Sequence, residues 1–209
     1  MSSAASFHYD DSKGCCSDAY LLPKVWEILK NNPWPAGSKR LFDLGCGNGA
    51  VAHQLSKEGY EVTGVDPSEK GIELAKAAYP DVRLEIGSAY DDLASKYGRF
   101  PLVLSLEVVE HVYSPRLYAK CIFDLLEPDG RAVISTPYHG YWKNLAIAVT
   151  GKMDSHHSPL WDHGHIKFWS VKTLSLLLQE VGLVVERVYR VGRIPILAKS
   201  MILTARRPK

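Results

Sequence analysis

The strongest restriction on the fold comes from residues 41–50, which read LFDLGCGNGA. Glycine has no Cβ, so the backbone can turn sharply after the apolar strand and can approach a ligand closely. A helix-forming run follows at once, and the first N–H groups of such a helix are free to bind a polar ligand. Asp66 comes about 20 residues later, where an acid binds ribose hydroxyls. The pattern predicts a site for a cofactor that carries a nucleoside.

Strand-like and helix-like runs alternate through the first two thirds of the chain. The predicted strands are 41–44, 61–65, 82–86, 102–106 and 131–135, and the predicted helices are 18–30, 48–58, 68–78, 116–126 and 171–181. This alternation favours a parallel sheet with helices on both faces. The last two strand-like runs, 183–191 and 197–204, are joined by too short a segment for a helical crossover, which predicts an antiparallel hairpin.

Length and composition indicate a single globular domain. The chain has 209 residues and a net charge of +2, without a basic stripe, so we expect no nucleic-acid partner. Residues 1–17 are polar, which predicts a mobile segment and no signal peptide, ahead of one domain at 18–209. The four cysteines include the adjacent Cys15 and Cys16, which suggests free thiols in a reducing compartment. The cytoplasm is the expected location.

Residues 137–169 form an unusual segment that is rich in aromatic side chains and histidine. It leaves the carboxyl end of the fifth predicted strand. Ligands of parallel sheets bind in a crevice outside these strand ends. The segment is therefore expected to cover a site for the second reactant.

Five motifs together match a known family. They are DLGCGNG at 43–49, VDPS at 65–68, LEVVEHV at 106–112, LEPDG at 126–130 and GHIKFWS at 164–170. The chain resembles the class I S-adenosylmethionine-dependent methyltransferases, and among them the ubiquinone-biosynthesis O-methyltransferases, over roughly residues 40–190. The resemblance implies a Rossmann-like α/β fold with a seven-stranded sheet, mostly parallel with an antiparallel C-terminal strand. It also implies S-adenosylmethionine as cofactor.

The resemblance further implies which residues meet the cofactor. They are Asp43, Gly45, Gly47, Asp66, Pro67, Ser88, Ala89 and Leu106. Asp43 and the first two glycines would face the amino-acid end, Asp66 the ribose and Pro67 the adenine. Ser88 stands where the family often has an aspartate for the adenine amino group, so the backbone near Ala89 is an alternative contact.

Glu107, Glu110 and His111 form a Glu-x-x-Glu-His motif. On a helical turn these three side chains share a face, where they would hold a divalent metal or act as acid and base. In the ubiquinone O-methyltransferases a motif of this form is associated with a metal ion, so Mg is the metal to consider. The alternative is that Glu110 and His111 only support the fold.

The covering segment supplies further candidates for catalysis and acceptor binding. His139 and His165 join His111 as candidate bases, because histidine titrates near neutral pH. His165 is equally suited to bind loop backbone, and the histidine spacing matches no zinc pattern. The candidate acceptor-binding residues are Tyr138, Tyr141, Trp142 and Trp161. Alternatively, these four aromatic side chains would pack against one another as a small core of the segment, or would contact a membrane surface. Tyr9 and Tyr20 are candidates to close over the cofactor.

The expected function is methyl transfer from S-adenosylmethionine to a small-molecule acceptor, with O-methylation of a hydroxyl group as the first choice. N-methylation is the nearest alternative, since no residue distinguishes oxygen from nitrogen. Gly45, Gly47 and Ala50 also satisfy the Gly-x-Gly-x-x-Ala pattern of NAD-binding oxidoreductases. A nucleoside-binding protein without catalysis is the third alternative.

Overall fold

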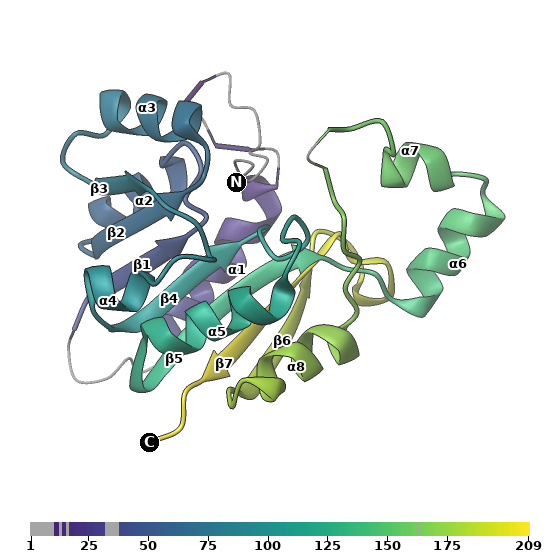
Figure 1. Cartoon of the computed structure of the whole chain (residues 1–209). Coiled ribbons are helices and arrows are strands. Elements are labelled where there is room, and N and C mark those ends of the chain that lie inside the picture. The colour runs from purple at the N-terminus through teal and green to yellow at the C-terminus, as the bar shows by residue number, and fades with distance from the viewer. Residues whose placement is uncertain (1–10, 13, 16, 32–37, 163) are drawn as a thin grey trace.

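The computed structural model describes residues 11–209 except 13, 16, 32–37 and 163. Its centre is a seven-stranded sheet in the order β3-β2-β1-β4-β5-β7-β6 (Figure 1). The strands are β1 (Arg40–Leu44), β2 (Glu61–Asp66), β3 (Arg83–Ile86), β4 (Phe100–Leu106), β5 (Leu126–Pro137), β6 (Val184–Val191) and β7 (Ser200–Arg206). Strands β1 to β5 pair in parallel, whereas β7 is antiparallel to both β5 and β6. The predicted sheet, including its antiparallel C-terminal strand, is confirmed.

Helices cover both faces of the sheet. They are α1 (Asp18–Asn31), α2 (Ala50–Lys57), α3 (Glu69–Ala78), α4 (Leu93–Tyr97), α5 (Pro115–Leu125), α6 (Tyr141–Val149), α7 (Met153–His157) and α8 (Val171–Glu180), with a short 3-10 turn at η2 (Pro195–Leu197). Apolar side chains of α1, α2 and α3 pack into one core, and those of α4, α5 and α8 pack into a second core across the sheet. The buried strands between them read as nearly continuous apolar runs, as expected of a parallel sheet covered on both faces.

The strand order reverses between β1 and β4, and this reversal determines where a ligand can bind. Helices that follow strands on either side of such a switch point leave a crevice outside the carboxyl ends of the strands. The Ser105 hydroxyl of β4 donates a 2.8 Å hydrogen bond to the Leu44 carbonyl of β1 at this place. The glycine-rich loop and the Glu-x-x-Glu-His motif therefore emerge side by side.

Some elements differ from the sequence-based expectation. Helices α4 and α7 were not expected; each has only five residues, which is too short for a periodic pattern to identify. Strand β5 begins at Leu126 rather than at Arg131. Leu126 pairs with Phe100 and Arg131 with Leu102, so residues 127–130 form an irregularity inside the strand pairing.

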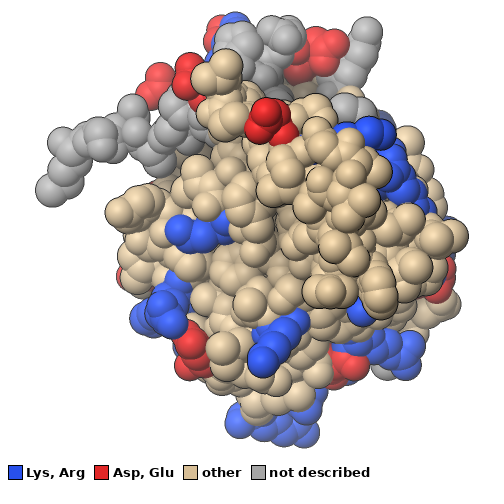
Figure 2. All heavy atoms as spheres, turned by 90° about the vertical axis from the view of Figure 1, so that its right-hand side faces the viewer, with Lys and Arg blue, Asp and Glu red and all other residues tan. Residues whose placement is uncertain are grey.

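Helices α6 and α7 lie within the segment 137–169 and extend away from the sheet beyond the end of β5 (Figure 1). Figure 2 views this side of the molecule and shows a broad surface with few charged side chains. Exposed apolar residues on the segment include Tyr141, Trp142, Val149 and Leu160. In the part of the chain that the structure describes, no helix is both long and apolar enough to cross a membrane.

Gly64 in the middle of β2 allows the glycine-rich loop to pack closely on the sheet. A Cβ at this position would lie 2.8 Å from Leu84 Cδ2 and 2.9 Å from Cys46 Cβ. Because a side chain here would overpack the core, we expect Gly64→Ala to lower the free energy of unfolding by about 1–3 kcal/mol. Urea unfolding measures this change. Glu61→Ala, at the exposed end of the same strand, is the control, and an unchanged urea midpoint for Gly64→Ala would contradict the prediction.

Candidate active site

The glycine-rich loop turns sharply between β1 and α2. Gly45 and Gly49 have φ angles of 84° and 78°, a left-handed region that side chains other than glycine rarely adopt. The N–H groups of Gly45 and Cys46 both donate to the Val65 carbonyl, at 2.8 and 3.0 Å. The loop is thereby held against the end of β2, next to Asp66.

Asp66 organises the backbone on both sides of this crevice. Its Oδ2 accepts a 2.9 Å hydrogen bond from the Gly47 N–H, and its Oδ1 accepts a 2.8 Å bond from the Ser68 N–H. Burial raises the pKa of the Asp66 carboxyl, while these two hydrogen bonds oppose the rise. Burial, together with the charge of the neighbouring Asp66, raises the pKa of Asp43 to about 7. Two buried acids thus face the loop.

The remaining expected cofactor contacts surround the same strand ends. Pro67 directly follows β2, and Leu106 ends β4. Ser88 lies after β3, where its N–H donates to Asp91 Oδ2 at 2.7 Å and its Oγ accepts from the Tyr90 N–H at 3.2 Å. The Ser88 side chain therefore forms a hydrogen bond within its own loop. The adjacent Ala89 is half-buried.

The Glu-x-x-Glu-His motif does not form the expected helical face. Residues 107–111 make a non-helical turn, and Glu107 has a φ of 53°. Its Oε1 accepts a 2.8 Å bond from the Ser135 hydroxyl, and its Oε2 accepts a 3.2 Å bond from the Ser200 hydroxyl. The prediction that Glu107 shares a face with Glu110 and His111 is wrong, because the turn directs Glu107 towards β5 and β7.

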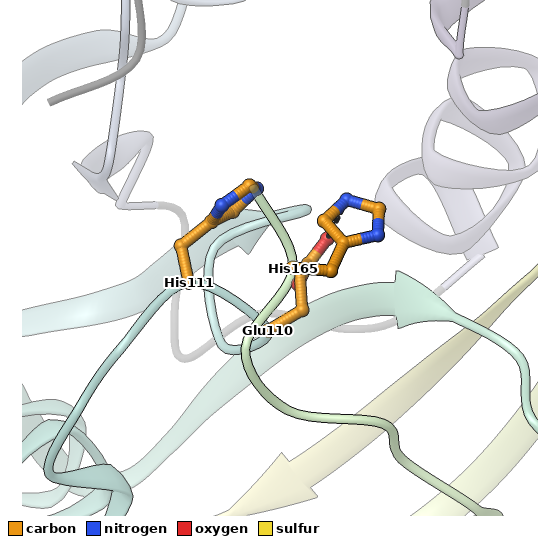
Figure 3. A group of neighbouring side chains, drawn as sticks. All are labelled: Glu110, His111 and His165. Atoms are coloured by element: carbon orange, nitrogen blue, oxygen red, sulfur yellow. Dashed lines mark ion pairs between the residues drawn. The ribbon is translucent and has the colours of Figure 1, made fainter. Parts of the chain in front are cut away.

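Glu110, His111 and His165 come together instead, as Figure 3 shows. One potential ligand atom of each lies within 4.8 Å of the others. Glu110 Oε2 accepts a 3.0 Å bond from the Thr136 hydroxyl, while Oε1 is buried without a hydrogen-bond partner and lies 4.0 Å from His165 Nε2. The covering segment is attached here, because the Glu110 carbonyl accepts from the N–H groups of Ile166 and Lys167.

The protonation of this cluster is shaped by burial. Burial and the charge of Glu107 raise the pKa of Glu110 well above its ordinary value. Burial and then His111 lower the pKa of His165 to about 4. The His165 imidazole is therefore neutral at pH 7, the state that a general base requires, and its low pKa makes it a weak base in the ligand-free protein. One His111 ring nitrogen, Nδ1, lies 3.1 Å from the Gly164 carbonyl, which orients that ring.

His139, the third candidate base, belongs to a different cluster. Its ring lies 5.4 Å from His156, 5.8 Å from His157 and 5.0 Å from Phe168, measured between ring centroids. Burial, together with the charge of Lys143, lowers the pKa of His139 to about 4. The structure thus pairs His111 with His165 and keeps His139 with the residues of α7.

The four aromatic candidates also separate. Trp161 lies beside His111 and His165, with ring centroids 6.0 and 5.2 Å away. Tyr138 is buried in the core and forms an isolated bridge with Trp169. Tyr141 and Trp142 are 73% and 60% exposed on α6. This exposure favours a surface position over pocket lining for these two residues; a membrane contact there stays a prediction.

Sequence reasoning overlooked several residues of the site. Ser135 and Ser200 hold Glu107, and the Ser200 hydroxyl lies 3.3 Å from the Tyr20 hydroxyl, which brings α1 to the site. Lys143 is buried on α6. It is the only charged residue in the run 141–149, a signal that could have identified it. Tyr9, the other expected closing residue, lies outside the described residues.

The fold and site define a class: an α/β protein that presents two buried acids and a glycine-rich loop at a switch point of the sheet. The methyltransferase-domain family matches residues 20–188. The chain belongs to this family. The resemblance seen in the motifs is confirmed at that level.

Relatives named ubiquinone biosynthesis O-methyltransferase are similar to much of the chain. The Caulobacter sp. (strain K31) protein is 38% identical over 125 residues, which cover 58% of this chain and 49% of the relative. The Ruegeria pomeroyi protein is 33% identical over 153 residues, covering 71% and 61%. The chain thus spans about half to three fifths of the length of these relatives.

Solved structures share the fold. A structure described as an S-adenosylmethionine-dependent methyltransferase from Mesorhizobium loti superposes with a TM-score of 0.64 at 21% identity, covering 87% of this chain and 97% of that one. Magnesium protoporphyrin IX methyltransferase from Synechocystis, with bound S-adenosylhomocysteine, gives 0.62 at 21% identity, covering 88% and 79%. At this level of identity the likeness concerns the fold.

Proposed function

We propose that this chain transfers the methyl group of S-adenosylmethionine to a hydroxyl group of a small-molecule acceptor. The observation that carries the proposal is the placement of two sites at adjoining strand ends. Asp43 and Asp66 lie at β1 and β2 beside the glycine-rich loop, and Glu110, which follows β4, meets His165 of the segment that follows β5. Family membership and relatives named O-methyltransferase support the same reaction.

The cofactor would lie across the ends of β1 and β2. The Asp66 carboxylate would accept hydrogen bonds from the ribose hydroxyls through its remaining lone pairs, while its bonds to Gly47 and Ser68 hold it in place. Ionised Asp43 would attract the ammonium group at the amino-acid end. These contacts would aim the sulfonium methyl group towards β4.

The acceptor would then attack the methyl carbon in line with the departing sulfur. Alignment of two bound reactants can supply about 7–11 kcal/mol of the barrier. A hydroxyl acceptor also has to lose its proton. His165, neutral and adjacent to the unpaired Glu110 Oε1, is the base that we assign to this step.

A divalent metal is the alternative role of the same cluster. Mg²⁺ prefers oxygen ligands, and the expected oxygen ligand Glu107 is bound to two hydroxyls elsewhere. One carboxylate and two imidazoles suit a transition metal or zinc better. Glu110, His111 and His165 would hold such an ion, and it would lower the pKa of a bound hydroxyl group.

Asp43 predicts how cofactor affinity depends on pH. Because the pKa of this carboxyl is raised to about 7, it is increasingly protonated below pH 7 in the free protein. Only the ionised form attracts the cofactor ammonium, so we expect affinity for S-adenosylhomocysteine to fall by up to about tenfold per pH unit below 7. Titration calorimetry over this range measures the slope.

The variant Asp43→Asn separates this effect from the titration of Asp66. It should bind S-adenosylhomocysteine weakly near pH 8 and lose most of the slope below pH 7. An unchanged slope in this variant would assign the pH dependence to Asp66 and contradict the role of Asp43.

Calorimetric titration with S-adenosylhomocysteine and, separately, NAD tests the proposed function. Binding of S-adenosylhomocysteine alone would support it and justify a screen of phenols, catechols and amines as acceptors. Binding of NAD alone would refute it in favour of an oxidoreductase. Binding of S-adenosylhomocysteine without turnover of any acceptor would favour a non-catalytic nucleoside-binding protein.

A further inference from the structure

Lys143 places a charged group on a buried side chain that forms no ion pair among the described residues. Its side chain lies on α6, and the residue is only 9% exposed. The ammonium donates one hydrogen bond, 3.2 Å long, to the Lys199 carbonyl. Among the ion pairs of the described residues, none involves Lys143. A buried ammonium without a carboxylate partner is unfavourable. Its presence therefore points to a counter-ion that binds from outside.

One further cation, Arg193, and one acid, Glu107, act on the charge of Lys143. Burial and the charge of Arg193, partly opposed by Glu107, lower the pKa of Lys143 to about 8. The charge of Lys143 in turn lowers the pKa values of His139, His156 and His165, on which burial is the larger influence. Glu107, the acid that acts on Lys143, is bound to Ser135 and Ser200, and burial raises its pKa to about 7. Glu107 is thus held by two hydroxyls instead of pairing with Lys143, and Arg193 adds to the positive charge there.

We propose that Lys143 binds a carboxylate or a similar anionic group of the methyl acceptor, and that it selects anionic acceptors over neutral ones. This inference rests on the proposed function. The Lys143 ammonium lies at the Lys199 carbonyl, which directly precedes β7 and Ser200, the residue whose hydroxyl binds Glu107. The glycine-rich loop follows β1, three strands away in the sheet, about 14 Å at the usual strand spacing. This separation favours the acceptor over the cofactor as the source of the anion.

The physical basis of the selection is the pairing of charges away from water. An ammonium and a carboxylate form a charge-assisted hydrogen bond, which is about twice as strong as a neutral one. A neutral acceptor of the same shape leaves the buried ammonium unpaired. Sites with such a group reject analogues that cannot pair with it.

Benzoate and benzamide test the proposal, because they have nearly the same shape and only benzoate is charged at pH 7. Their dissociation constants are measured by NMR titration of the protein saturated with S-adenosylhomocysteine. We expect benzoate to bind at least about tenfold more tightly than benzamide. Lys143→Met should abolish this preference, and Lys143→Arg should retain part of it. Lys152→Met removes an exposed charge from the same segment and is the matched control.

Three results would overturn the proposal. One is equal binding, or no binding, of the two compounds by the wild-type protein. Another is a benzoate preference that survives in Lys143→Met. The third is a loss of affinity for S-adenosylhomocysteine in Lys143→Met, which would assign the charge to the cofactor carboxylate. Failure of the wild-type protein to bind S-adenosylhomocysteine would refute the proposed function. This result is distinct from a failure of the present proposal, because the preference for benzoate can also be measured in the absence of S-adenosylhomocysteine.

Stability measurements distinguish anion binding from a structural role. Replacing a buried, unpaired charge with an apolar side chain of similar length is often neutral or stabilising. We therefore expect the melting temperature of Lys143→Met without ligand to equal or exceed that of the wild-type protein. A markedly lower melting temperature, together with an unchanged benzoate preference, would show that Lys143 serves the fold alone.

Discussion

Replacing Asp66 by alanine is expected to weaken binding of S-adenosylhomocysteine by about 100-fold or more. The carboxylate accepts hydrogen bonds from the Gly47 and Ser68 N–H groups and, in our proposal, from the ribose hydroxyls. Hydrogen bonds to a charged group each contribute about 1.5–3 kcal/mol, so the loss of the ribose contacts alone accounts for the effect. Titration calorimetry at pH 8 measures the affinity.

The same substitution should also destabilise the ligand-free protein, since two buried N–H groups lose their acceptor. We expect a decrease of about 1–3 kcal/mol in the free energy of unfolding. Asp66→Asn keeps the shape and one acceptor atom, and Asp81→Ala, which removes an exposed acid before β3, is the control. A folded Asp66→Ala protein that keeps its affinity within threefold, roughly 0.6 kcal/mol, would refute the placement of the ribose.

Replacing His165 by alanine is expected to lower turnover by about 100-fold while leaving the affinity for S-adenosylhomocysteine unchanged. A positioned base typically contributes a factor of about 10² to 10⁴ to the rate. His165 is neutral at pH 7 because its pKa is about 4, and its Nε2 lies 4.0 Å from Glu110 Oε1. Steady-state kinetics with an acceptor from the screen measure the change.

Two further variants define the role of His165. Glu110→Gln should lower turnover to a similar extent, and the double variant should lose little more, because residues that act as a unit are not additive. His53→Ala on α2 removes a histidine that stacks on Tyr79 and is the control. If a chelator abolishes wild-type turnover and added Zn²⁺ restores it, the cluster is a metal site. Normal turnover of His165→Ala would exclude both roles.

The cofactor half of the site was largely predictable, because each signal lies within a short stretch of sequence. The apolar strand, the glycines and the acid after the second strand act through backbone geometry that local residues impose. The positions of Asp43 within β1, of Gly45 directly after β1 and of Asp66 at the end of β2 agree with the expected ones. Their contacts with the cofactor stay predictions.

The acceptor half was predicted less well. His111 and His165 are far apart in the sequence, and no pattern indicates that they meet. Glu107 was grouped with Glu110 on the assumption of a helical turn, but its φ of 53° sends the side chain towards Ser135 and Ser200. Lys143 directly follows the aromatic residues Tyr141 and Trp142, and the sequence pattern of this segment does not indicate that the lysine side chain is buried.

The sequence by itself determined the order of strands and helices, the antiparallel ending and the loop that follows β1. These depend on local turn chemistry, apolar periodicity and connection lengths, which neighbouring residues specify. Only the tertiary structure decided which polar side chains of 107–169 meet, which face solvent and which are buried without a partner. Those outcomes depend on how a segment of irregular conformation packs on the ends of β4, β5 and β7, and contacts between distant residues leave no periodic pattern in the chain.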